Sequence, residues 1–284
     1  MTDTPARIVD AHVHLWDPAR TDWYPYLSGG QQLNMGDTSG MSRRFDVPTY
    51  RAESAGWNVE KLVNVAAATG RHSIDETLEL DRRGEVDGII GGLPPTDTTA
   101  EAIELLDRQL GAARFRGVRP MGQFPTPLPS DDVLRALQER DLLFEVMAHP
   151  DQLDAAARGL EAHPDLTVVV EHTGWPRSST DEERALWQAG IDALAGVGPN
   201  VHCKLSGLAM PLGSMAPAVL RPWLEPALEA FGVERCCFAS NFPVDGLHGT
   251  LDQLWSSYSE VTAGLGAAAR DQLFATNAER LYRI

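Results

Sequence analysis

The feature that most constrains the fold of this chain is a repeated alternation of short apolar runs with amphipathic segments. The runs are rich in β-branched residues, and the segments between them, such as 99–113 and 181–195, carry apolar residues at three- and four-residue steps. Eight runs alternate in this way within 284 residues. This predicts an α/β fold, a (β/α)8 TIM barrel formed as a single domain over residues 1–284, with a doubly wound open sheet as the alternative. The expected strands are Arg7–His14, Lys61–Ala67, Val86–Leu93, Phe115–Arg119, Leu142–Met147, Leu166–His172, Asn200–Leu205 and Arg235–Ala239.

The charge balance limits the kinds of partner that the surface can attract. Lys and Arg number 24 against 40 Asp and Glu, a formal net charge of −16. Nucleic acid and anionic membranes both require a basic surface, so neither is an expected partner. The sequence contains no apolar run of membrane-spanning length and no secretory pattern at its start, so we expect a cytoplasmic protein. The three cysteines fit reduced core residues better than a disulfide framework.

One connection is much longer than the others. Residues 17–59, between the first two expected strands, are rich in Gly, Pro, Asp and aromatic residues such as Trp23 and Tyr26. Loops of this length in compact domains are usually functional. We expect this connection to be a lid over a pocket, or else a packing or oligomer contact. The sequence leaves open whether the protein forms a homo-oligomer.

Strand alternation predicts which side chains enter the barrel. It places Asp10, His12 and His14 on one face of the first strand, and it points Asn64 inward. By the same rule Glu145, His202, Lys204 and Ser206 point inward. Barrel interiors are usually filled by branched aliphatic residues, so a polar set indicates a functional site or paired ions. Glu145 and Lys204 are expected either to pair with each other or to contribute to a site.

Several polar residues fall where the expected strands end. His14, Arg119, His172, Ser206 and Asn241 lie at or just beyond such ends, and active sites in this fold sit at the carboxyl-terminal face. The pair His12-x-His14 can ligate a metal or polarise a carbonyl, or it is a buried structural pair. Arg119 can bind a substrate carboxylate or form an internal ion pair. The turn after His172 is expected to place Trp175 at the barrel mouth.

Other common catalytic motifs are missing from the sequence. It has no glycine-rich phosphate loop, no G-x-S-x-G elbow and no C-x-x-C pair. These absences disfavour nucleotide use, serine hydrolase chemistry and thiol redox chemistry.

A set of longer motifs resembles a known family. They occur in the family's order and cover nearly the whole chain: DAHVHLWDP at 10–18, DWYPYL at 22–27, FRGVRP at 115–120, EHTGWP at 171–176, CKLSGL at 203–208 and FASNFPVDGL at 238–247. Together they resemble the amidohydrolase-2 family of the amidohydrolase superfamily, especially its sugar-lactonase-like branch. The resemblance implies a barrel of the metal-dependent-hydrolase type. Related activities in that branch are fuconolactonase-like, rhamnonolactonase-like and dicarboxylate lactonase-like, with decarboxylases as more distant relatives.

The resemblance also implies residue roles, with one departure. His12, His14 and His172 match the family's histidines, and Arg119 matches a possible anion contact. The motif after the last strand usually resembles S-D-W-P, whose Asp is the general base, whereas this chain has Asn241 there. An amide cannot take a proton from water and is a weaker metal ligand than a carboxylate. Two alternatives therefore stay open. The site holds a divalent ion, Zn or Mn, on His12, His14 and His172, or it works without a metal.

The expected function is hydrolysis of a small lactone or related cyclic ester by water. His12 and His14 would stabilise the oxyanion, His172 or Asp245 would accept a proton, and Asn241 would hold the water or substrate. The expected substrate contacts are Arg119, Trp16, Trp175 and Glu145. A small anionic or sugar-derived molecule is the expected substrate. The alternatives are a metal-dependent decarboxylase and a barrel that binds a metabolite without catalysis.

Overall fold

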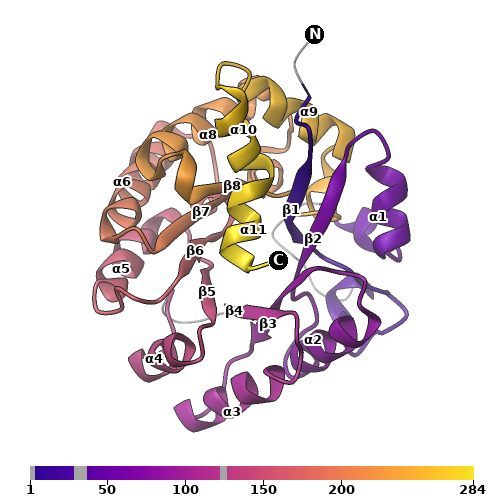
Figure 1. Ribbon diagram of the computed structural model, residues 1–284, viewed down its shortest axis with the longest axis vertical. Helices are drawn as coiled ribbons and strands as arrows, with labels where there is room; N and C mark the ends of the chain where they lie inside the picture. Colours follow the sequence, from indigo (N-terminus) through magenta and orange to yellow (C-terminus); the bar gives the residue numbers. More distant parts are fainter. Residues whose placement is uncertain (1–3, 29–36, 122–126) are drawn as a thin grey trace.

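Eight parallel strands form the centre of the molecule (Figure 1). The structure, a computed structural model, describes residues 4–28, 37–121 and 127–284. Each strand pairs with the next along the chain, in the order β1 to β8. All eight strands predicted from the sequence are confirmed. Their bounds are β1 Ile8–Val13, β2 Val59–Val65, β3 Gly88–Leu93, β4 Phe115–Pro120, β5 Leu143–Val146, β6 Val168–Val170, β7 Val201–Leu205 and β8 Cys236–Phe238.

The chain after β8 returns to β1 and closes the sheet. The backbone N–H of Asn241 donates to the carbonyl of His12 at 2.8 Å, and that of His14 donates to the carbonyl of Phe242 at 2.8 Å. An open doubly wound sheet would leave these edge groups unpaired. The predicted (β/α)8 barrel is therefore confirmed.

Helices surround the barrel and cover its outer face (Figure 1). Several begin at a threonine whose hydroxyl accepts from the helix backbone, as Thr98 does at α3 and Thr180 at α6. Within the described ranges, no helix is long and apolar enough to cross a membrane. The bounds are α1 Val47–Glu53, α2 His72–Arg83, α3 Thr99–Gln109, α4 Asp131–Glu139, α5 Pro150–Leu160, α6 Asp181–Val197, α7 Ala209–Leu212, α8 Pro217–Phe231, α9 Leu251–Val261, α10 Ala267–Asp271 and α11 Asn277–Tyr282.

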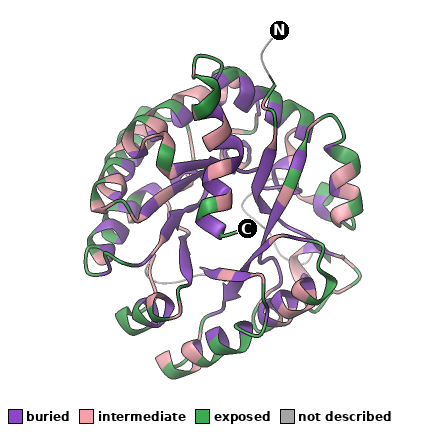
Figure 2. Ribbon diagram, in the orientation of Figure 1, coloured by how far each residue is buried: buried purple, intermediate pink, exposed green. Residues whose placement is uncertain are grey.

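The main apolar layer lies between the strands and these helices. Figure 2 shows the strands buried and the outer helix faces exposed. Phe144 and Val168 on the strands pack in one cluster with Leu153 of α5 and Trp187 of α6. Burying side chains of this kind contributes about 1.5 to 3 kcal/mol each, so this layer is the main source of stability. Cys203, Cys236 and Cys237 are buried and free, as expected.

A second apolar cluster closes the amino-terminal end of the barrel. Ala278, Leu281 and Tyr282 of α11 pack against inward-facing residues such as Val9 and Cys237. The guanidinium of Arg116, at the start of β4, donates to the Tyr282 carbonyl at 2.7 Å. Figure 1 shows α11 lying across the centre of the strands. We call α11 and this cluster the barrel floor.

Two of the predicted inward-facing residues point the other way. The register of β1 shifts between Asp10 and Val13, so an extra residue changes the alternation there. Asp10 instead accepts from the Tyr50 hydroxyl of α1 at 2.7 Å and lies toward the helix layer. Val63 and Val65 belong to the interior cluster, so Asn64 between them faces outward, where it accepts from the Leu15 N–H. The predictions for Asp10 and Asn64 were wrong because sequence alternation does not reveal a bulge or the burial of valines inside the barrel.

Candidate active site

A cavity of about 180 Å³ lies where the strands end. It brings together six of the residues predicted from the sequence, which come from the ends of β1, β4, β6 and β8. The other lining residues are mostly apolar. The predicted members are His14, Trp16, Arg119, His172, Trp175 and Asn241, and the others are Tyr26, Met41, Ala66, Ala67, Thr69, Met121, Met210 and Val244.

His12 and His14 form a closely spaced pair, of which His14 lines the cavity and His12 is not among the lining residues. Their Nε2 atoms lie 3.1 Å apart. His14 Nδ1 lies 2.8 Å from the carbonyl of Val65, and His12 Nδ1 lies 3.3 Å from the ammonium of Lys204. Burial, with the charge of Arg119 as the next cause, lowers the pKa of His14 to about 3. Burial and Lys204 lower the pKa of His12 well below its usual value, so both rings are neutral near pH 7.

His172 is presented by an unusual turn after β6. His172, Thr173 and Trp175 have φ of 52°, 56° and 39°, and Gly174 between them also has a positive φ. Left-handed conformations cost roughly 1 to 2 kcal/mol per non-glycine residue, and such strain concentrates at functional sites. The turn places both His172 and Trp175 on the cavity.

The His172 ring is oriented by its neighbours. Its Nδ1 lies 3.0 Å from the Ser206 hydroxyl. A Cβ at Gly207 would come within 2.4 Å of the ring, and Gly207 has a φ of 67°, so no larger residue fits there. Burial and then the charge of Arg119 lower the pKa of His172 well below its usual value. The ring is thus a fixed, neutral imidazole.

Arg119 and Glu171 form an incomplete ion pair beside His172. Arg119 Nη1 lies 3.6 Å from Glu171 Oε2, and His172 Nε2 lies 3.7 Å from the same oxygen. Nε and Nη1 of Arg119 and both oxygens of Glu171 are buried without a hydrogen-bond partner. Burial raises the pKa of Glu171 to about 8, against the opposing effect of Arg119. Buried polar atoms without partners are costly, so Arg119 and Glu171 are suited to bind a ligand or ion that supplies the missing contacts.

Glu171 was not singled out from the sequence. The alternation that placed Glu145 inside the barrel, continued along the next strand from Val169, would have placed Glu171 inside as well. The other missed lining residues, such as Met41 and Met210, lie in short helical turns of the connections after β1 and β7, where no periodicity marks them.

Asn241 occupies the position expected for the general base. Its φ is 55°, a conformation that Asn tolerates better than most residues. Its Nδ2 donates to Asp245 Oδ1 at 2.9 Å, which turns the amide oxygen away from Asp245. Burial raises the pKa of Asp245 to about 7, and its Oδ2 has no partner. Asp245 is not among the lining residues, and it contacts the lining residue Asn241.

Glu145 lies deeper than the cavity. Both of its oxygens accept from Lys204 Nζ at 2.7 Å, and the Tyr282 hydroxyl of α11 donates to Oε1 at 2.8 Å. Neither Glu145 nor Lys204 is among the residues that line the cavity. This geometry matches the expected pairing of the two residues and places no substrate contact on Glu145.

Part of the long connection forms one wall of the cavity. Tyr26 and Met41 come from residues 17–59, and Trp16 stacks on His14 with ring centroids 6.0 Å apart. The Tyr26 hydroxyl donates to the carbonyl of Ala67. Side chains of this connection thus line the cavity, and residues 29–36 of the expected lid lie outside the described part of the chain.

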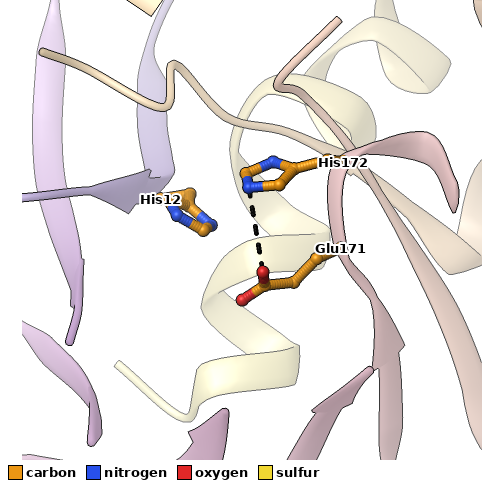
Figure 3. A group of neighbouring side chains, drawn as sticks. All are labelled: His12, Glu171 and His172. Carbon is orange, nitrogen blue, oxygen red and sulfur yellow. Dashed lines mark ion pairs between the residues drawn. The ribbon is translucent and has the colours of Figure 1, made fainter. Parts of the chain in front are cut away.

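Three of these side chains have the donor set of a metal site. His12, Glu171 and His172 each offer one atom, and these atoms all lie within 4.8 Å of one another (Figure 3). Two imidazoles and a carboxylate whose two oxygens lack hydrogen-bond partners suit a divalent ion. The set overlaps the predicted His12, His14 and His172, with Glu171 as the carboxylate that Asn241 does not supply. The residues present therefore fit a divalent metal.

Comparison with known proteins gives the chain its family. An L-fucono-1,5-lactonase of Burkholderia ambifaria is 30% identical over 97% of this chain and 95% of its own. A solved amidohydrolase of Burkholderia multivorans with bound zinc is 24% identical, with a TM-score of 0.80 over 98% of this chain and all of that one. A 5-carboxyvanillate decarboxylase of Sphingomonas paucimobilis is 14% identical, with a TM-score of 0.66 over 99% of this chain and all of the decarboxylase chain. The Amidohydro_2 family model, described as amidohydrolase, matches residues 9–284, so the chain belongs to this family of hydrolases.

Proposed function

We propose that the protein opens a small lactone or related cyclic ester by attack of water on the ring carbonyl. The observation that carries this proposal is the meeting in one cavity at the strand ends of His14, His172 and Arg119, whose Nε and Nη1 lack hydrogen-bond partners. Similarity to an L-fucono-1,5-lactonase supports a lactone as the substrate class. The substrate is a small molecule, in keeping with a cavity of about 180 Å³.

Arg119 and two tryptophans would bind and orient this substrate. The unpaired Nε and Nη1 of Arg119 are suited to a carboxylate or another anionic group. Trp16 and Trp175 offer flat apolar faces for the ring. An anionic group would also accept hydrogen bonds from Arg119, whose Nη1 lies 3.6 Å from Glu171 Oε2, too far for a hydrogen bond.

The chemistry would use the neutral imidazoles. As water attacks, the carbonyl oxygen gains negative charge, which the Nε2–H of His12, shared with His14 Nε2 at 3.1 Å, would stabilise by donating to the oxyanion as well. His172 would accept the proton from water, and Glu171, 3.7 Å from its Nε2, would share the resulting charge. The proton would then pass to the ring oxygen as the C–O bond breaks, giving a hydroxy acid. Asn241 would position the water, with Asp245 holding its amide.

We also propose that the metal, if one is bound, is Zn or Mn held by His12, Glu171 and His172. Such an ion would supply polarisation of the carbonyl and a more acidic bound water. None of the roles given above to Arg119, Trp16 and Trp175 depends on it.

The test is a pH-indicator screen of sugar and dicarboxylate lactones with protein purified without chelator, before and after chelation. We expect acid release from at least one lactone. His172→Ala should lower its rate about a thousandfold, within the range for loss of a general base. Arg158→Ala is the control, since Arg158 lies exposed on α5. No turnover across the panel, or unchanged turnover in His172→Ala, would contradict the proposal.

Decarboxylation of a small carboxylic acid is the second candidate. The fold similarity to a 5-carboxyvanillate decarboxylase and the aromatic walls beside Arg119 favour it. Release of carbon dioxide instead of acid would identify it. Binding of a lactone without either product would point to a non-catalytic barrel.

A further inference from the structure

Lys204 is a fully buried charge that the proposed chemistry does not use. Its exposed fraction is 0%. Its Nζ lies 2.7 Å from each oxygen of Glu145 and 3.3 Å from Nδ1 of His12. An ammonium has three N–H donors and no acceptor. The three contacts therefore use all of its donors, two on the carboxylate and one on the imidazole.

This contact determines where the protons of the histidine pair lie. Because Lys204 can only donate, Nδ1 of His12 must be the acceptor, and the ring proton is on Nε2. His14 Nδ1 faces the Val65 carbonyl, which can only accept, so the proton of His14 is on Nδ1. The free lone pair of His14 Nε2 then receives the Nε2–H of His12 across 3.1 Å. Every ring nitrogen in the pair has an assigned role.

The surroundings of His12 differ from those of a typical metal ligand. A histidine that binds a metal usually donates its other N–H to a carbonyl, carboxylate or similar oxygen. His14 meets the carbonyl of Val65, and His172 meets the hydroxyl of Ser206. His12 meets an ammonium instead. One of its nitrogens has its lone pair bound by Lys204, and the other carries the proton.

We propose that Lys204 is a positioning residue that blocks both ring nitrogens of His12 and so weakens the binding of divalent cations by His12, Glu171 and His172. A cation at this group has to displace a proton from His12 or displace the ammonium from it. The positive charge of Lys204 adds repulsion in a dry interior. Metal occupancy of this site is thereby set by a residue that is not itself a ligand. The inference concerns metal affinity and does not depend on the proposed reaction.

The variant that tests this is Lys204→Met with Glu145→Gln. Removing both charges avoids a lone buried carboxylate, and apolar replacement of buried ion pairs is often tolerated. We expect its dissociation constant for Zn²⁺, measured by competition with a chromogenic chelator, to be at least tenfold lower than that of the unaltered protein. The expected size follows the 10- to 100-fold effects of residues that contact metal ligands. Equal or weaker Zn²⁺ binding would overturn the proposal.

Two controls locate the effect. Tyr282→Phe removes a hydrogen bond to Glu145 but leaves Lys204 on His12, so its Zn²⁺ affinity should match the unaltered protein. Adding His12→Ala to the double variant should abolish the gain, and a gain that persists would place the ion elsewhere and contradict the proposal.

A measurement on the unaltered protein covers the case in which the double variant does not fold. Nitrogen-15 NMR of metal-free protein should show His12 protonated on Nε2 and His14 protonated on Nδ1. A His12 protonated on Nδ1 would show that Lys204 does not hold this nitrogen, and the proposal would fail.

Discussion

The two ends of the barrel differ in whether their buried charged and polar groups have hydrogen-bond partners. Toward the floor, Glu145, Lys204 and Tyr282 satisfy one another through contacts of 2.7 to 2.8 Å. At the mouth, buried polar atoms of Arg119, Glu171, Thr173 and Asp245 have no partner, and the backbone after β6 is strained. One end of the barrel thus carries buried charges that are fully hydrogen-bonded, and the other carries buried polar atoms that are available to bind a ligand, as expected for a barrel enzyme.

The largest expected effect is at the inner pair. Lys204→Ala leaves Glu145 as a lone buried charge and should lower the free energy of unfolding by about 3 to 5 kcal/mol. Urea unfolding measures this. Lys61→Ala is the control, because its ion pair with Glu279 is partly exposed and should contribute under about 1 kcal/mol. A Lys204 variant as stable as the control would erase the contrast between the two ends.

At the mouth, activity and stability should separate. Arg119→Met removes the unpaired donors and should lower kcat/KM for an anionic lactone about a hundredfold, from loss of a charged hydrogen bond of about 2 to 3 kcal/mol. Its thermal unfolding midpoint should stay level or rise, because the guanidinium is only loosely paired. If the midpoint dropped as it does for Lys204→Ala, Arg119 would belong to the structural set.

The pH dependence of stability sharpens the same contrast. The pKa of Glu171 is raised from an ordinary value of 4.5 to about 8, so the folded protein binds more protons than the unfolded one between these values. Its contribution to stability is present below pH 4.5 and is lost as the pH rises through 8. Glu171→Gln cannot ionise and should exceed the unaltered protein by about 1 to 3 kcal/mol at pH 8.5, with little difference at pH 4.5. Parallel pH profiles of unfolding for the two proteins would refute this.

The smallest effect comes from a single hydrogen bond at the floor. Tyr282→Phe removes the hydroxyl that donates to Glu145 and should cost about 1 kcal/mol, because Lys204 still satisfies the carboxylate. Urea titration of the two proteins side by side resolves this. A loss near that of Lys204→Ala would mean that α11, and not the ion pair, supplies most of the local stability.

The fold was predictable because periodicity records burial. The eight apolar runs became eight strands within a few residues of their expected bounds. The alternation of β5 and β7 placed Glu145 and Lys204 inside the barrel, where the structure pairs them. The same rule failed in β1, where a register shift turned Asp10 toward Tyr50. A single extra residue in a strand has no signature in the spacing of apolar residues.

The candidate site was predictable in part for the same reason. His14, Arg119, His172 and Asn241 could be placed at strand ends, and the structure brings all four to one cavity. Glu171 was missed because it stands between an apolar strand and a more conspicuous histidine. The two oxygens of Glu171 lack hydrogen-bond partners because of the atoms that surround them in the fold, and the sequence does not show which atoms these are.

The sequence by itself determined the barrel, the family motifs and the neutral residue at position 241, since each depends on residue type and order. Only the tertiary structure decided which charges are satisfied. Lys204 lies 59 positions from Glu145 and 192 from His12 in the chain, yet it contacts both. Hydrogen-bond partners depend on distances of a few ångströms between side chains from different strands, and closure of the barrel sets those distances.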